Sequence, residues 1–273
     1  MISTASGASS RVSASRIDWI EPEWPAPARV RACSTTRVGG VSGGPYASLN
    51  LAEHVGDRPE RVAINRARLR AALGLPAEPR WLQQVHGCAL IEASDSATSA
   101  CDADAIMTRT PGVVCAVMTA DCLPVLLCDA CGSRVAAVHA GWRGLAAGIL
   151  ERACAALVTP PEMLLAWLGP AIGPAAFEVG PEVRDQLAGE DRESRACFHA
   201  ATGDRWLADL GGLARLRLSR LGVTEIHGGG YCTYTDSRHF FSYRRDGVTG
   251  RMASLIWLAP EDGAPATGDS HHV

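Results

Sequence analysis

Lysine is absent from this sequence of 273 residues, so all 26 of its basic residues are arginines. The absence excludes Schiff-base chemistry on a lysine, a phosphate-binding P-loop and a lysine general base. An anionic substrate must therefore be bound by arginine side chains, by backbone N–H groups or by a metal ion. The same bias also arises from genome composition, so by itself it names no function.

Long apolar runs are absent as well. No stretch approaches the roughly 18 residues that a membrane-spanning helix needs, and the beginning MISTASGASSRVSAS lacks the apolar core of a secretory signal. A formal net charge of −3 and a pI of about 6.2 give no excess of positive charge for nucleic acid or an anionic membrane. We therefore expect a cytoplasmic protein whose partners are small molecules, with neither nucleic acid nor a membrane among them.

Ten cysteines are present, but a reducing compartment argues against a disulfide framework for them. The sequence has one CxxC motif, formed by Cys128 and Cys131, and no second one to complete a four-thiolate zinc site. The pair falls on an expected strand and its turn instead of a helix N-terminus. We therefore expect its role to be structural or incidental.

Strand and helix patterns intermix along the whole chain, with several expected hairpins. Strand patterns cover residues 29–37, 80–93 with a turn at His86-Gly87, and 252–260, whereas helix patterns cover 58–75, 145–158, 181–189 and 206–223. This mixture favours an α/β or α+β domain with mixed sheets over a doubly wound parallel sheet. The length suits one large domain, which we place at residues 17–260 between disordered tails at 1–16 and 261–273.

The stretch 113–144 combines two apolar runs with polar residues that a buried strand should not contain. PVLLC and RVAAVHA are joined by a turn at 130–133, which predicts a β-hairpin. With the turn centred there, His139 lies opposite Pro124, so Cys122 and His139 share a face as diagonal neighbours about 7–8 Å apart. One metal ion is then within reach of both side chains.

Other polar residues near this hairpin are candidates for chemistry. Asp121, beside the cysteine, either orients a ligand, moves a proton or only caps a turn. The glycine-rich stretch GGVSGGPYASLNL has Arg37 at its mouth, and the turn HAGWRG contains Arg143; both present free N–H groups beside an arginine, which suits an oxyanion or phosphate. The alternative for the glycine-rich stretch is a plain surface loop. Our candidate residues for substrate or phosphate are Arg37, Asn50 and Arg143.

Five motifs resemble those of one known family: LQQVHG, VMTADCLPVLLC, AAVHAGWRG, LGPAIGPAAFEVG and FFSYRRDGVTGRMAS. Together they resemble the YfiH or laccase-domain family, whose members are described as polyphenol oxidases, peptidoglycan-editing factors or purine nucleoside phosphorylases. The resemblance extends from about Trp19 to Leu258. It implies a single domain in which helices lie outside mixed sheets, an α/β/β/α sandwich. It also implies one zinc ion, bound by His86 of QVHG, Cys122 of TADC and His139 of HAGWRG.

The resemblance also implies phosphorolysis of adenosine, inosine, guanosine and methylthioadenosine, together with adenosine deamination. Three protein ligands of N and S type leave a fourth zinc position open, as in catalytic zinc sites. Water activated at that position attacks a purine carbon in deamination. We assign catalytic roles to Asp121, Cys122 and His139.

Two other hypotheses compete with this one. In the first, Cys122 is the nucleophile and His139 the base of a hydrolase that edits peptidoglycan precursors. In the second, the protein is a copper-dependent polyphenol oxidase, although the sequence has no His-x-His pair of the kind that multicopper oxidases use. A non-enzymatic binding role fits the expected fold but not an open three-ligand site.

Overall fold

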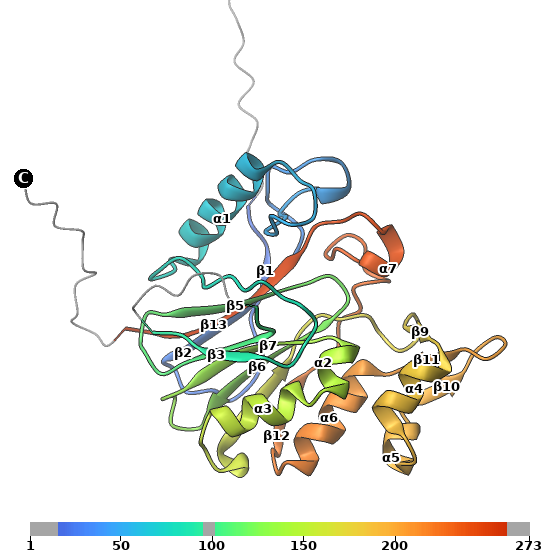
Figure 1. The fold of residues 1–273 in the computed structure, drawn as a ribbon. Helices are drawn as coiled ribbons and strands as arrows, with labels where there is room; N and C mark the ends of the chain where they lie inside the picture. Colours follow the sequence, from blue (N-terminus) through green and yellow to red (C-terminus); the bar gives the residue numbers. More distant parts are fainter. Residues whose placement is uncertain (1–15, 95–101, 261–273) are drawn as a thin grey trace, which may run out of the picture.

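The computed structural model describes residues 16–94 and 102–260. Apart from Arg16, the predicted tails at 1–16 and 261–273 lie outside the described residues. Two central β-sheets pack face to face, and helices cover their outer faces (Figure 1). This is the single mixed α/β domain expected from the sequence. None of the described helices is long and apolar enough to cross a membrane.

The four-stranded sheet is antiparallel throughout, with the order β1 (Trp19–Ile20), β2 (Val30–Thr35), β13 (Met252–Leu258) and β5 (Val114–Thr119). The six-stranded sheet has the order β12 (Glu225–Gly228), β8 (Leu164–Leu168), β6 (Leu123–Asp129), β7 (Val135–Ala140), β4 (Ala105–Thr108) and β3 (Leu90–Glu92). It is mixed, because β12 runs parallel to β8 and β3 runs parallel to β4. A small antiparallel sheet adds β10 (Phe198–Ala200), β11 (Trp206–Ala208) and β9 (Glu178–Val179).

The described helices are α1 (Pro59–Leu73), α2 (Trp142–Ala146), α3 (Ile149–Ala156), α4 (Pro181–Ala188), α5 (Arg192–Arg195), α6 (Leu210–Arg220) and α7 (Tyr243–Asp246), with 3₁₀ turns at Gly44–Tyr46 and Pro161–Met163. Helix α1 lies over the four-stranded sheet, whereas α3 and α6 lie over the six-stranded sheet (Figure 1). The order of layers is therefore α/β/β/α.

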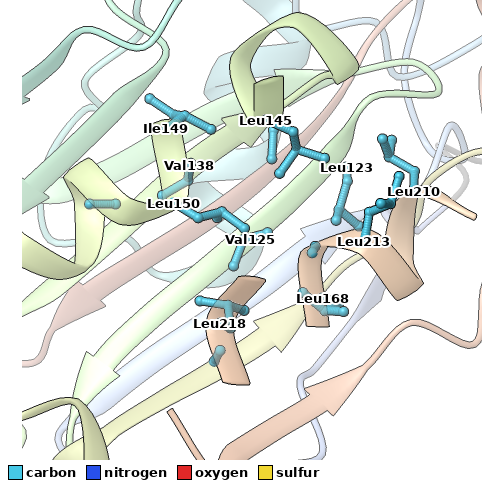
Figure 2. Packing of buried hydrophobic residues seen from close by; sticks show 14 of the residues in the cluster. Leu123, Val125, Val138, Leu145, Ile149, Leu150, Leu168, Leu210, Leu213 and Leu218 are labelled. Atoms are coloured by element: carbon cyan, nitrogen blue, oxygen red, sulfur yellow. The ribbon is translucent and has the colours of Figure 1, made fainter. Parts of the chain in front are cut away.

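Alternating residues of the central strands build these layers. On β6, Val125 and Leu127 face the helices, while Leu126 faces the other sheet. Figure 2 shows the helix side, where Leu150 of α3 and Leu213 of α6 pack onto the strands. Both strand faces are apolar because both are covered, which explains the nearly continuous hydrophobic runs in the sequence.

The register of the β6–β7 hairpin is the one predicted from the sequence. Pro124 pairs with His139, and the turn spans residues 130–133. Residues two apart share a face, so His139 belongs to the same face as Ala137, which packs toward the four-stranded sheet. The histidine therefore lies at the end of the space between the two sheets.

Three of the predicted elements differ from the structure. The helix expected at 145–158 is two helices, because Gly148 adopts a left-handed conformation (φ 82°) between α2 and α3. The helix expected at 206–223 begins only at Leu210, where Asp209 caps it by accepting a hydrogen bond from the N–H of Gly212; β11 precedes it. Residues 80–89 form no strand but only isolated bridges at Arg80 and Gln83, and the side-chain amide of Gln84 makes two hydrogen bonds with the backbone of Met118.

Candidate metal centre

Three residues from distant parts of the chain converge at one end of the inter-sheet space. His139 is near the end of β7, Cys122 directly precedes β6, and His86 lies in the bend before β3. Their ligand atoms all lie within 4.8 Å of one another, and the two imidazole rings meet edge to face. His139 is buried, Cys122 is partly buried and His86 is exposed. The group is therefore open to solvent on the side of His86.

Asp104 fixes the orientation of the buried histidine. It lies one residue before β4, fully buried, and its carbonyl accepts the backbone N–H of His139 (2.7 Å). Its Oδ1 accepts a second hydrogen bond from His139 Nδ1, also at 2.7 Å. Because an ionised carboxylate only accepts hydrogen bonds, Nδ1 carries the proton and Nε2 is the nitrogen left to bind a metal.

The same carboxylate also holds the bend that carries His86. It accepts the backbone N–H groups of His86 (2.9 Å) and Gly87 (2.7 Å). His86 has a positive φ of 60°, which is uncommon for a residue with a side chain and is maintained here by these bonds. One buried aspartate thus positions two of the three convergent residues. The sequence analysis did not identify Asp104, which directly precedes β4 and lies outside the predicted hairpin of β6 and β7.

Two glycines in the turn after His139 leave room for the group. A Cβ at Gly141 would lie 3.0 Å from Cys122 Sγ and 3.5 Å from His86 Cδ2. A Cβ at Gly144 would lie 2.9 Å from the carbonyl oxygen of Gly87. The motif HAGWRG therefore requires its glycines, because Gly141 lies against the side chains of Cys122 and His86 and Gly144 lies against the backbone of the bend at Gly87.

The charges of the group favour a thiolate. Burial opposes ionisation of Cys122, but His139 and His86 beside it lower its pKa to about 6. Burial likewise acts against protonation of His139, yet the thiolate and Asp104 raise its pKa to about 9. A thiolate is the form in which cysteine binds metals and also the form in which it attacks as a nucleophile.

A cavity of about 520 Å³ opens above the three residues. Its volume falls in the usual range for small-molecule sites. Besides His86, Cys122 and His139, the lining includes His54, Gln84 and Asp121. It also holds three arginine–aromatic pairs, in which the guanidinium lies over the ring: Arg143–Trp142, Arg244–Phe177 and Arg251–Tyr243. Arg244 and Arg251 are functional candidates that the sequence analysis did not single out.

Asp121 links the cysteine to the opposite wall of the cavity. It has a positive φ of 90° and is buried. Its Oδ1 accepts a hydrogen bond from the Thr233 hydroxyl and its Oδ2 accepts one from the N–H of Arg244, both at 2.6 Å. These bonds tie α7 to the residue next to Cys122. They give Asp121 a positioning role, and its predicted catalytic role stays a prediction.

Arg143, predicted to bind substrate or phosphate, is exposed at the cavity, whereas Arg37 and Asn50 are not part of the lining. Arg37 donates from Nε to the carbonyl of Ala47 and from Nη1 to that of Ser237. Asn50 is fully buried and its Oδ1 accepts the backbone N–H of Arg251. Contact of Arg37 and Asn50 with substrate stays a prediction, and their hydrogen bonds hold the loops around the cavity.

Comparisons with known proteins show the family to which the chain belongs. A family described as "Multi-copper polyphenol oxidoreductase laccase" matches residues 31–259. Relatives named purine nucleoside phosphorylase YfiH from Shigella flexneri and Escherichia coli (strain K12) are each 56% identical over 239 residues, 88% of this chain and 98% of the relative. The crystal structure of a Neisseria meningitidis protein has a TM-score of 0.85 at 50% identity and covers 89% of this chain and 99% of its own. The chain therefore belongs to the YfiH, or laccase-domain, family.

Proposed function

We propose that this protein is a zinc-dependent purine nucleoside phosphorylase that acts on adenosine, inosine, guanosine and methylthioadenosine, and that the same site deaminates adenosine. The observation that carries the proposal is the convergence of His86, Cys122 and His139 on a cavity that three arginines also line. The names of the curated relatives support phosphorolysis, with a nucleoside and inorganic phosphate as substrates. A cytoplasmic location is part of the proposal, because the thiol of Cys122 has to remain reduced.

The residues present fit a zinc ion. Two imidazoles and one thiolate are zinc ligands, and three protein ligands are the number found in catalytic sites. Asp104 supplies the carboxylate that accepts a hydrogen bond from the non-ligating nitrogen of His139. Copper is the second candidate, since imidazole and thiolate bind it as well. The metal, when bound, supplies Lewis acidity toward oxygen atoms of the substrates.

The protein's own side chains provide the remainder of the site. The rings of Trp142, Phe177 and Tyr243 offer apolar surface to a purine, and the arginines offset the charge of phosphate. In phosphorolysis a phosphate oxygen bonds to C1′ of the ribose while the C1′–N9 bond breaks. The electron pair of that bond goes to the purine, which takes up a proton, so the products are the free base and ribose 1-phosphate. In deamination a water adds at C6 of adenosine and ammonia leaves.

One observation favours the second hypothesis, a cysteine-type hydrolase in peptidoglycan precursor editing. Cys122 has a lowered pKa beside His139, which is the arrangement of a nucleophile and its base. A stoichiometric metal on Cys122 separates the two hypotheses, because a metal-bound thiolate is a poor free nucleophile. The third hypothesis, copper-dependent polyphenol oxidation, has support from the description of the matching family.

The deciding experiment follows adenosine with and without inorganic phosphate. We expect adenine and ribose 1-phosphate only when phosphate is present, and inosine in both cases. His139→Ala abolishes both reactions, and chelation abolishes them until zinc is restored. Activity that resists chelation, together with a covalent adduct on Cys122, would refute the proposal in favour of the hydrolase.

A further inference from the structure

Arg251 has an unusual hydrogen-bonding pattern for a partly buried arginine. It directly precedes β13 and lines the cavity. Its Nη1 donates to the carbonyls of Thr249 and Gly250, both at 3.0 Å. Among residues 16–94 and 102–260, neither Nε nor Nη2 has a hydrogen-bond acceptor, and no carboxylate forms an ion pair with the guanidinium.

This pattern leaves one edge of the guanidinium available. Nε–H and Nη2–H form the fork that binds two oxygens of a phosphate or carboxylate at once. A desolvated cation without an anionic partner costs free energy, so an unpaired arginine that faces a cavity indicates a missing anion. Burial lowers the pKa of Arg251, while the negative charges of Cys122 and Asp121 act in the opposite direction. Arg251, Cys122 and Asp121 all line the same cavity.

The backbone on both sides of Arg251 is fixed. The backbone N–H of Arg251 donates to Oδ1 of the fully buried Asn50 at 3.0 Å, and the carbonyl of Arg251 accepts the N–H of Leu51 at 3.3 Å. Asn50 is in turn held by Asp57, which accepts a hydrogen bond from its Nδ2. A Cβ at Gly250 would lie 2.7 Å from Phe241 Cζ, so the chain passes here in close contact with its neighbours. The motif GRMAS and the asparagine of the glycine-rich stretch therefore act together to place one side chain.

All three arginines around the cavity lie over an aromatic ring, but the other two are more exposed than Arg251. Arg143 is exposed and lies over the ring of its own neighbour Trp142. Arg244 is exposed and donates from Nη1 to the carbonyl of Glu178. Arg251 alone of the three is partly buried and has its backbone clamped by a buried side chain. An exposed cation contributes less to anion binding than a desolvated one, because water screens it.

We propose that the Nε–Nη2 edge of Arg251 binds the phosphate that attacks the nucleoside. The identity of the anion rests on the proposed phosphorylase function. The anion site itself rests on the cavity and on the unpaired guanidinium edge.

The test compares Arg251→Met and Arg251→Lys with a control, Arg205→Met, which removes an exposed arginine outside the cavity lining. All three are loaded with zinc, and their metal content is measured first. In Arg251→Met we expect the KM for phosphate to rise about 10- to 100-fold, equivalent to about 1.4–2.8 kcal/mol at 1.4 kcal/mol per tenfold. Adenosine deamination uses no phosphate, so it should fall much less than phosphorolysis does. In Arg251→Lys we expect part of the phosphate binding to remain, because lysine keeps the charge without the fork.

Direct binding of inorganic phosphate to the zinc-loaded protein, measured by calorimetry, separates this proposal from the proposed function. A Kd for phosphate that is at least tenfold higher in Arg251→Met than in the wild type would support the anion site, even if no nucleoside is cleaved. An unchanged KM and unchanged phosphate binding in Arg251→Met would overturn it. A parallel loss of phosphorolysis and deamination would also overturn it, since Arg251 would then act on the fold or the metal.

Discussion

Replacing Asp104 with asparagine tests whether one buried carboxylate holds the metal ligands in place. The two carboxylate oxygens accept hydrogen bonds from His139 Nδ1 (2.7 Å) and from the N–H groups of His86 (2.9 Å) and Gly87 (2.7 Å). An asparagine has only one acceptor oxygen, and its NH₂ group takes the place of the second oxygen. That NH₂ group then faces an N–H donor of His139, His86 or Gly87, with which it cannot form a hydrogen bond. Whichever way the amide is oriented, at least one ligand-bearing segment loses its partner.

The size of the effect follows from these contacts. A hydrogen bond to a charged group contributes about 1.5–3 kcal/mol, and loss of a carboxylate behind a ligating histidine typically weakens metal binding 10- to 100-fold. We therefore expect the Kd for zinc to rise about 10- to 100-fold in Asp104→Asn, equivalent to about 1.4–2.8 kcal/mol. The apo form should also unfold at a lower temperature, since Asp104 is fully buried.

Zinc affinity is measured by competition with a chromophoric chelator, and circular dichroism checks that the variant is folded. Asp129→Asn is the matched control. Asp129 is also a buried carboxylate, but it accepts hydrogen bonds from Ser133 and Arg134 in the turn at the far end of the same hairpin. Its replacement should lower stability and leave zinc affinity unchanged. A folded Asp104→Asn protein that binds zinc as tightly as the wild type would refute the reasoning.

Three further predictions concern Gly141, Arg143 and Asp191. Gly141→Ala places a methyl group 3.0 Å from Cys122 Sγ and should lower zinc affinity, whereas Gly230→Ala, with open space around it, should not; equal metal affinity in both would contradict this. Arg143→Ala removes an exposed cation and should raise the KM for phosphate only about two- to fivefold, as expected for about 0.5–1 kcal/mol; a 100-fold rise would show that Arg143 is the main anchor. Asp191→Ala should lower Tm at pH 7, because Asp191 caps α5 and pairs with Arg220, which hold its pKa below the ordinary range. Since the folded-state pKa is depressed, this contribution is present above the ordinary aspartate pKa and disappears as pH falls through the folded-state value, so the Tm difference should vanish in acid.

The placement of Cys122 beside His139 was predictable because strand register is a local property, whereas His86 came only from the family resemblance. The apolar runs and the turn at 130–133 define the pairing of His139 with Pro124, and the face of Cys122 follows from the period of two. The layers were expected from the family resemblance, and the apolar character of both strand faces agrees with them. The helix at 58–75 was also predicted, because its apolar residues have helical spacing. In the structure it spans Pro59–Leu73, and Gly74 ends it in a left-handed conformation.

The contacts that depend on distant segments were not predictable from one sequence. Asp104 lies opposite His139 only because β4 pairs with β7, and nothing local in DADAIM signals that pairing. Arg251 lines the cavity only because β13 inserts between β2 and β5. The hydrogen bond from the backbone N–H of Arg251 to Asn50 was not foreseen either, because it joins segments 201 residues apart, and the predicted contact of Asn50 with substrate stays a prediction. Each of these cases depends on tertiary pairing rather than on local propensity.

The central claim is that His86, Cys122 and His139 bind one metal ion, and metal analysis of protein purified without oxygen tests it most directly. The account predicts one zinc per chain in the wild type and loss of that zinc in Cys122→Ser, with the variant still folded. Full zinc occupancy in Cys122→Ser, or an active wild-type protein that holds no metal, would contradict it.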